Sequence, residues 1–220
     1  MKVKSAGMLR SNRSTPPKST DQKLNGGKRI FRYIALGISF LSEPWVVTFP
    51  IVWIAMAIMF GGSTQDFLIS CGYLALFLVP LLITRIVFLR KKSISDWDLS
   101  NRHERVALLS RLWVFMIPFL IVSWFLRSPM IYHQLFLMIF LFAPFFMITL
   151  EWKISGHTIM ATTAAGLLFL IDPSFWWILP FPIFVAWSRI LLKRHTLAQA
   201  VGGILYAILF LFITRSIGLL

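Results

Sequence analysis

Long apolar runs, separated by short polar breaks, make up most of the chain from residue 30 onward. The runs are continuously apolar and do not alternate with polar residues, which favours helices over transmembrane strands. Seven of them are expected to span a membrane, at 44–60, 67–84, 112–126, 130–150, 158–171, 174–187 and 198–214. Several contain only 14–17 residues, below the roughly 17–25 that a crossing needs, so flanking polar residues must complete them. The pattern predicts an all-α, polytopic transmembrane bundle of about six to seven spans.

The beginning of the chain has a different character. Residues 1–29 carry eight Lys and Arg against one acid, Asp21, and contain too few apolar residues to bury, so we expect a disordered basic tail. The apolar run at 34–41 is too short to span and is expected to be an interfacial or re-entrant piece. Glu43, directly after it, is expected to cap the first span or to pair with a nearby cation. The chain therefore divides into a tail, 1–29, and a transmembrane domain, 30–220.

The composition supports a lipid environment. Hydrophobic residues make up 58% of the 220 residues and charged residues only 14%, against roughly 25% charged residues in soluble domains. A chain of this length has too little interior to hide 21 Phe and nine Trp from water. These proportions exclude a soluble globular protein, a disordered chain and a coiled coil.

The net charge of +14 is distributed unevenly over the two ends of the predicted spans. One end takes the chain through Arg32 and the loops 85–111, 151–157 and 188–197, which together hold 20 of the 22 Lys and Arg. Lys and Arg accumulate on the cytoplasmic side of membrane proteins, so this end is predicted to be cytoplasmic. We expect an integral multi-pass protein of the plasma (inner) membrane. The basic tail is expected to bind anionic lipid headgroups, and no nucleic acid.

The polar residues of the basic end are suited to anion chemistry. The loop 85–111 contains Arg102 and Arg105, the second break reads Lys153-Ile154-Ser155-Gly156-His157, and the third runs from Ser188-Arg189 to His195 and Gln199. Guanidinium groups offer forked donors to phosphate oxygens, and the amide groups at a helix start add a second anion site. Two histidines beside a phosphate can divide nucleophilic attack and proton donation between them.

His195 and Gln199 are four residues apart and share one face if a helix begins there. The side-chain carbonyl of Gln199 then accepts a hydrogen bond from one ring nitrogen of His195. That contact fixes the tautomer and leaves the other nitrogen free to attack.

The order and spacing Lys153-x-Ser155-Gly156-His157, then Ser188-Arg189-x5-His195-x3-Gln199, resemble the second and third motifs of the type 2 phosphatidic acid phosphatase superfamily. The resemblance implies that His195 is the nucleophile that forms a phosphohistidine and that His157 is the general acid. It also implies that Arg189, Ser155 and Gly156 hold the phosphate. The expected activity is metal-independent hydrolysis of a phosphate or diphosphate ester on a membrane lipid, with no cofactor.

Three departures from the family pattern are visible. The first motif, Lys-x6-Arg-Pro, is altered, because Val106 follows Arg105; Arg102 and Arg105 are its candidate counterparts, and with Lys153 they are expected to bind phosphate. Ile154 stands where the family has a proline, and Gln199 replaces an aspartate. A neutral amide orients His195 but does not stabilise its positive charge as a carboxylate does.

Two other functions are compatible with the sequence. Gln199 and the altered first motif favour a catalytically weak or inactive protein that binds lipid phosphates. A small transporter or flippase is the other, but it should carry ionisable residues in mid-membrane, where His133 is the nearest candidate. A disulfide within the chain is excluded because Cys71 is the single cysteine, and the four histidines lack the close spacing of a metal site.

Overall fold

The computed structural model describes residues 26–91, 101–126 and 128–220, and at 112–119, 122 and 126 the backbone alone. Within these residues every regular element is a helix, which confirms the all-α prediction. The elements are α1 (Gly26–Leu41), η2 (Pro44–Thr48), α2 (Phe49–Phe60), α3 (Thr64–Arg90), α4 (Arg102–Leu126), α5 (Pro129–Glu151), α6 (Gly156–Ile171), η3 (Pro173–Ile178), α7 (Phe181–Leu191) and α8 (Leu197–Ser216).

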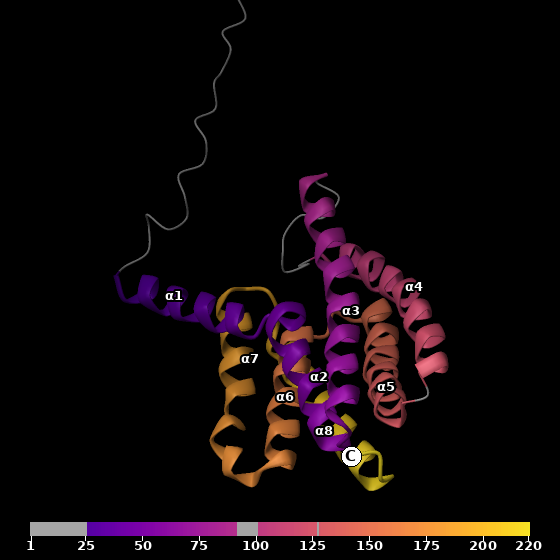
Figure 1. The fold of residues 1–220 in the computed structure, drawn as a ribbon. Coiled ribbons are helices and arrows are strands. Elements are labelled where there is room, and N and C mark those ends of the chain that lie inside the picture. The colour runs from indigo at the N-terminus through magenta and orange to yellow at the C-terminus, as the bar shows by residue number, and fades with distance from the viewer. Residues whose placement is uncertain (1–25, 92–100, 127) are drawn as a thin grey trace, which may run out of the picture.

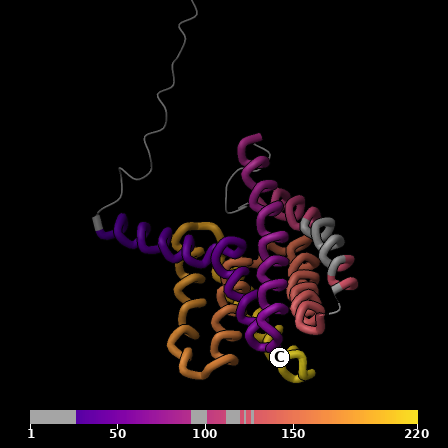
Figure 2. The backbone as a smooth tube through the Cα atoms, in the orientation of Figure 1, coloured from indigo at the N-terminus to yellow at the C-terminus, as the bar shows by residue number. Residues whose placement is uncertain are grey.

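The long helices stand side by side and α1 crosses one end of them (Figure 1). The chain passes repeatedly between the two ends, as the tube in Figure 2 shows. The α5–α6 and α7–α8 connections lie at the end that α1 crosses, and the C-terminal end of α3 points the same way. The segments predicted to share the basic end therefore do so in the structure.

Four helical segments are long and apolar enough to cross a membrane: Thr64–Arg90, Pro129–Glu151, Pro173–Leu191 and Leu197–Ser216. A fifth is obtained if Gly27–Leu41 and Pro44–Phe60, which meet at a 41° bend, are counted together. These assignments, which rest on length and composition in the described residues, are compatible with a multi-pass membrane protein. The count of six to seven spans stays a prediction.

Two predicted boundaries were wrong. The loop 85–111 is largely helical, because α3 continues to Arg90 and α4 already begins at Arg102. A basic residue in the last turn of a helix complements the negative end of the helix dipole, so Arg90 suits a helix end. Helix α1 likewise begins at Gly26, inside the predicted tail, and residues 1–25 lie outside the described residues.

Helix α6 lies at the centre of the packing, with α2, α7 and α8 against it. Its sequence explains this position, because small residues such as Ala161, Ala164 and Ala165 let neighbouring helices approach closely. On the α2 side, the core is aromatic: Phe49 stacks on Phe77 with ring centroids 5.1 Å apart, and Trp45 stacks on Phe142 at 5.7 Å. This packing holds the start of α6 at the basic end, where the motif residues are.

Candidate functional site: two histidines among buried cations

The start of α6 is held by its own cap and by α8. The hydroxyl of Ser155 caps the helix by accepting from the backbone N–H of Thr158, and the Ser155 N–H donates to the carbonyl of Gln199 over 3.2 Å. Ser155 is fully buried at this contact. The second and third motifs, which are some forty residues apart, are thus joined through the backbone, with Gly156 and His157 in the first turn of α6.

His195 lies just before α8 and is oriented by Gln199. Its Nδ1 is 3.2 Å from Oε1 of Gln199, and the same oxygen accepts from the backbone N–H of Thr196 at 3.1 Å. Because a backbone N–H is always a donor, this second contact fixes the oxygen of the amide toward the ring. Nδ1 therefore donates, and the lone pair is on Nε2. This geometry gives the predicted arrangement, in which one ring nitrogen of His195 donates to Gln199 and the other carries the lone pair.

Gln199 also stabilises the helix on which it lies. Thr196 is the N-cap of α8, and its hydroxyl accepts from the Gln199 N–H while the Gln199 side chain accepts from the Thr196 N–H. This reciprocal arrangement is a capping box, in which glutamine or glutamate is the usual third residue of the helix. The amide side chain therefore has a structural role at the start of α8 in addition to its contact with His195.

Arg189 and the turn after α7 hold His195 in place. The carbonyl of Arg189 accepts from the backbone N–H of Arg194 at 2.9 Å and of His195 at 3.3 Å. Lys193 reaches the required tight turn by adopting φ 55°, a conformation uncommon outside glycine. The Arg189 side chain is 1% exposed and donates to the hydroxyl of Ser39 on α1. Arg189 is therefore fixed between α7 and the crossing helix.

Two further predicted cations reach this end of α6. Arg105 on α4 is buried and donates from Nη1 to the Ile154 carbonyl over 2.7 Å. Lys153 donates from Nζ to the Arg194 carbonyl over 2.9 Å. Arg105, Arg189 and His195 all lie within electrostatic range of His157. The structure thus brings both histidines together with the cations of all three motif regions.

Burial and the surrounding charge together favour the neutral form of His195. Burial is the largest of the causes that together lower the pKa of His195 from 6.5 to about 3, followed by the positive charges of Arg105, Arg189 and Lys153. The hydrogen bond with Gln199 acts in the opposite direction. A base whose pKa lies this low is neutral at physiological pH, so Nε2 of His195 is available as a nucleophile.

Arg102 lies elsewhere. It is one turn before Arg105 on α4, and its Nη1 donates to the carbonyl of Leu150 in the last turn of α5. That contact satisfies one of the carbonyls left free at a helix end. Arg102 is absent from the charges that act on either histidine, so of the two first-motif candidates, Arg105 is the one that the structure places at the site.

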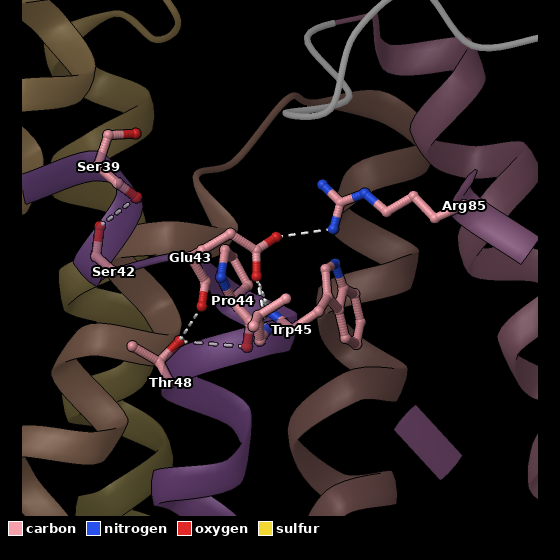
Figure 3. A network of polar contacts seen from close by, with 8 residues as sticks. Ser39, Ser42, Glu43, Pro44, Trp45, Thr48 and Arg85 are labelled. Atoms are coloured by element: carbon pink, nitrogen blue, oxygen red, sulfur yellow. Dashed lines mark hydrogen bonds and ion pairs between the residues drawn. The ribbon is translucent and has the colours of Figure 1, made fainter. Parts of the chain in front are cut away.

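Arg85 and Glu43 belong to the same site, although the sequence analysis placed neither there. Figure 3 shows Arg85 of α3 reaching Glu43 at the α1–η2 junction, with Nη1 2.7 Å from Oε1. The other carboxylate oxygen of Glu43 accepts from the backbone N–H groups of Trp45 and Val46. Both expected roles of Glu43, the cap and the ion pair, are confirmed.

Several buried charged side chains gather around this site within the described residues. Glu43 is the buried acidic side chain there, whereas Arg85, Arg105 and Arg189 are all buried. Arg85 is also within electrostatic range of His157. In the sequence, Glu43 and Arg85 each border a long apolar run, and this position is the signal that points to the pair. Buried guanidinium groups gathered at one end of the bundle are of the kind that suits an anion.

A small cavity of about 40 Å³ adjoins the start of α6. Arg85, Arg105, Gly156 and His157 line it on one side, and Trp45 and Phe142 are among its apolar residues. Two arginines and the first two residues of α6 thus border a common space, a combination that suits an anion. No group of three or more His, Cys, Asp or Glu in the described residues is arranged to hold a metal ion.

No family model, no curated protein and no solved structure matches this chain.

Proposed function

We propose that the protein hydrolyses a phosphate or diphosphate ester of a membrane lipid through a phosphohistidine at His195. One observation carries the proposal: His157 and His195, from separate motifs, converge with Arg105, Arg189 and Lys153 in a buried site at one end of an apolar helical bundle. The resemblance of the motifs to type 2 phosphatidic acid phosphatases points to the same chemistry. The lipid headgroup lies at the basic end, and its hydrocarbon part stays among the helices.

The proposed reaction proceeds in two displacements. Nε2 of His195 attacks phosphorus, the bond from phosphorus to the lipid oxygen breaks, and protonated His157 gives its proton to that oxygen. The negative substrate beside His157 favours its protonated form. Water then attacks the phosphohistidine while His157 takes a proton from it, which releases inorganic phosphate and restores both histidines. Arg105 and Arg189 neutralise the charge on the phosphoryl oxygens.

The test is phosphate release by the purified protein from a lipid monophosphate and a lipid diphosphate with the same chain. Turnover is expected to resist EDTA and to be inhibited by vanadate. His195→Ala should lower kcat at least roughly a thousand-fold, because it removes the attacking atom. The matched control is His133→Ala, since His133 is exposed on α5 and outside the site. Turnover that survives His195→Ala contradicts the mechanism.

Gln199 favours a second function, the binding of lipid phosphates without turnover. Its neutral amide orients His195 but gives no charge stabilisation to a phosphohistidine. A protein of this kind binds vesicles that contain a lipid phosphate and releases no phosphate from them. Binding that weakens in Arg189→Gln, combined with no release by the unaltered protein, supports this function and rejects the first.

The orientation and location belong to the proposal as well. The site lies on the cytoplasmic side of the plasma (inner) membrane, with the basic tail on anionic headgroups, and the bundle has six to seven spans. Cysteines introduced at positions 100 and 127, after Cys71→Ser, report the two sides. In intact cells, an impermeant thiol reagent should label position 127 and leave position 100 unlabelled; the reverse result overturns the orientation.

A further inference from the structure

Helix α1 carries a buried polar side chain, Ser39, within the apolar run 34–41. Ser39 is 7% exposed, and its hydroxyl accepts from Nη1 of Arg189 on α7. The two residues are 150 positions apart in the sequence, so the contact depends on the packing of α1 against α7. Ser39 belongs to none of the three motif regions, and it nevertheless touches one of the arginines proposed to hold the phosphate.

The face of α1 that carries Ser39 is the face packed on α7. Phe31, Ala35 and Ser39 follow one another at four-residue spacing and therefore share one side of the helix. The ring of Phe31 meets that of Trp187 on α7 edge to face, with centroids 6.5 Å apart. Ala35 is fully buried, and its small side chain lets the two helices approach closely. The turns before Ser39 thus hold its hydroxyl against α7.

The chain that follows Ser39 is anchored as well. Glu43, four positions on, places Oε1 2.7 Å from Nη1 of Arg85, and its other carboxylate oxygen accepts from two backbone N–H groups of η2. The hydroxyl of Ser42 donates to the carbonyl of Ser39 over 3.3 Å. Figure 3 shows this junction, with Glu43 reaching from the end of α1 toward Arg85. Ser39 is therefore fixed from both sides.

Arg189 is a side chain whose orientation matters for the proposed reaction. Its guanidinium lies within electrostatic range of both His157 and His195. An arginine side chain has many rotamers, and ordering it costs conformational entropy. Its planar fork matches two phosphate oxygens only when the plane is turned toward them. A hydroxyl that orders the guanidinium before the phosphate binds removes this cost from the chemical step.

We propose that Ser39 is a positioning residue of the phosphate site, which holds the guanidinium of Arg189 in the orientation that binds the phosphoryl group, and that α1 is thereby a part of the site. The role of Ser39 rests on the proposed function, because it acts through Arg189. Helix α1 then contributes to the reaction, although it supplies no residue of the three motif regions.

The experiment measures hydrolysis of radiolabelled hexadecyl phosphate in mixed micelles by the full-length protein. Ser39→Ala removes one hydroxyl and should lower kcat roughly ten-fold, with KM changed by less than about two-fold, because the orientation of Arg189 matters most in the transition state. The matched control is Ser42→Ala, which removes a buried hydroxyl three positions on that bonds to a backbone carbonyl. This control should change neither kcat nor KM.

A double-mutant cycle separates positioning from a general weakening of the fold. In an Arg189→Gln background, Ser39→Ala should cause no further loss of kcat, because the hydroxyl acts through the guanidinium that is already absent. Three results overturn the role of Ser39: an unchanged kcat in Ser39→Ala, an equal loss in Ser42→Ala, or the same ten-fold loss in the Arg189→Gln background.

The failure of the proposed function gives a different result, in which the unaltered protein releases no phosphate. The same cycle is then measured on the binding of radiolabelled hexadecyl phosphate in micelles. Weaker binding in Ser39→Ala, with no further weakening in the Arg189→Gln background, supports the role of Ser39 in a site that binds without turnover. Binding that Ser39→Ala leaves unchanged overturns it, and no binding by the unaltered protein overturns the phosphate site as a whole.

Discussion

The C-terminal part of the site, from Lys153 to Gln199, and its N-terminal part, around Glu43, Arg85 and Arg105, are built in different ways. In the first, the contacts that orient the reactive groups are local: His195 and Gln199 are four positions apart, and Ser155 caps its own helix. In the second, the side-chain contacts of Arg85 and Arg105 described above join remote segments, because Glu43 and Arg85 are 42 positions apart and Arg105 and Ile154 are 49 apart.

The comparison shows a division of tasks. The local contacts orient the reactive groups, because a helix start fixes the relative positions of residues three and four apart. Burial is the largest cause of the lowered pKa of His195, and the charges of Arg105, Arg189 and Lys153 lower it further, so that Arg105 is the contribution of the remote part. Orientation is therefore specified by short motifs, and the electrostatic setting by the packing of α3 and α4 against α5 and α6.

The largest expected effect comes from breaking the remote contact between Glu43 and Arg85. Glu43→Gln keeps the hydrogen-bond acceptor but removes the charge beside buried Arg85, and should lower the free energy of unfolding by about 3–5 kcal/mol. The double change Glu43→Gln with Arg85→Met removes both charges and should recover most of that loss. Thermal unfolding in detergent measures both variants.

The matched control for this prediction is Arg90→Met. Arg90 is exposed near the end of the same helix, and a surface change of this kind is expected within about 0.5 kcal/mol of the unaltered protein. A loss in Glu43→Gln no larger than that of the control contradicts the importance of the buried pair.

A smaller effect is expected at Gly203, where α8 meets the start of α6. A Cβ on Gly203 would overlap Oγ1 of Thr158 and lie 2.7 Å from the carbonyl oxygen of Ser155. Gly203→Ala must therefore push α8 from the start of α6, at a cost of about 1–3 kcal/mol, and should lower any turnover that depends on both histidines. Gly72→Ala on α3 is the control, since nothing lies within 4 Å of its added Cβ. Equal unfolding temperatures in the two variants reject the close contact.

The smallest expected effect concerns the pKa of His195, which reports the electrostatic setting of the site. In the folded protein the pKa of His195 is about 3, below the ordinary 6.5, so the unfolded chain binds more protons at this residue between these values. The contribution of His195 to the free energy of unfolding is therefore greatest above about pH 6.5 and decreases as the pH falls toward 3. Gln199→Glu keeps the capping box and adds a negative charge, and should raise the pKa of His195 by roughly 1–3 units.

NMR titration of isotope-labelled histidine measures this change, with His195→Asn used to assign the signal. An unaltered pKa in Gln199→Glu shows that residue 199 does not reach the ring in the folded protein. Gln199→Ala is the companion variant and should leave the pKa low, because it removes only the contact that favours the charged form.

Some features of the fold were predictable because they depend on local composition. The apolar runs and their polar breaks gave helices in the right places, and the Ser155 and Thr196 positions mark helix starts by their hydroxyl groups. The helix ends at Arg90 and Arg102 were missed, since basic residues are compatible with both a loop and a helix terminus. Arg85 was missed for the same reason: a charge at the end of an apolar run resembles a membrane-edge anchor.

The amino-acid sequence by itself determined the helical class, the motif residues and the tautomer of His195, because each depends on residues within a few positions of one another. Tertiary structure alone decided that Arg105, rather than Arg102, joins the histidines and that Glu43 pairs with Arg85. These features depend on which helices become neighbours, and that choice is made by the packing of whole helix faces and not by the spacing of residues along any one of them.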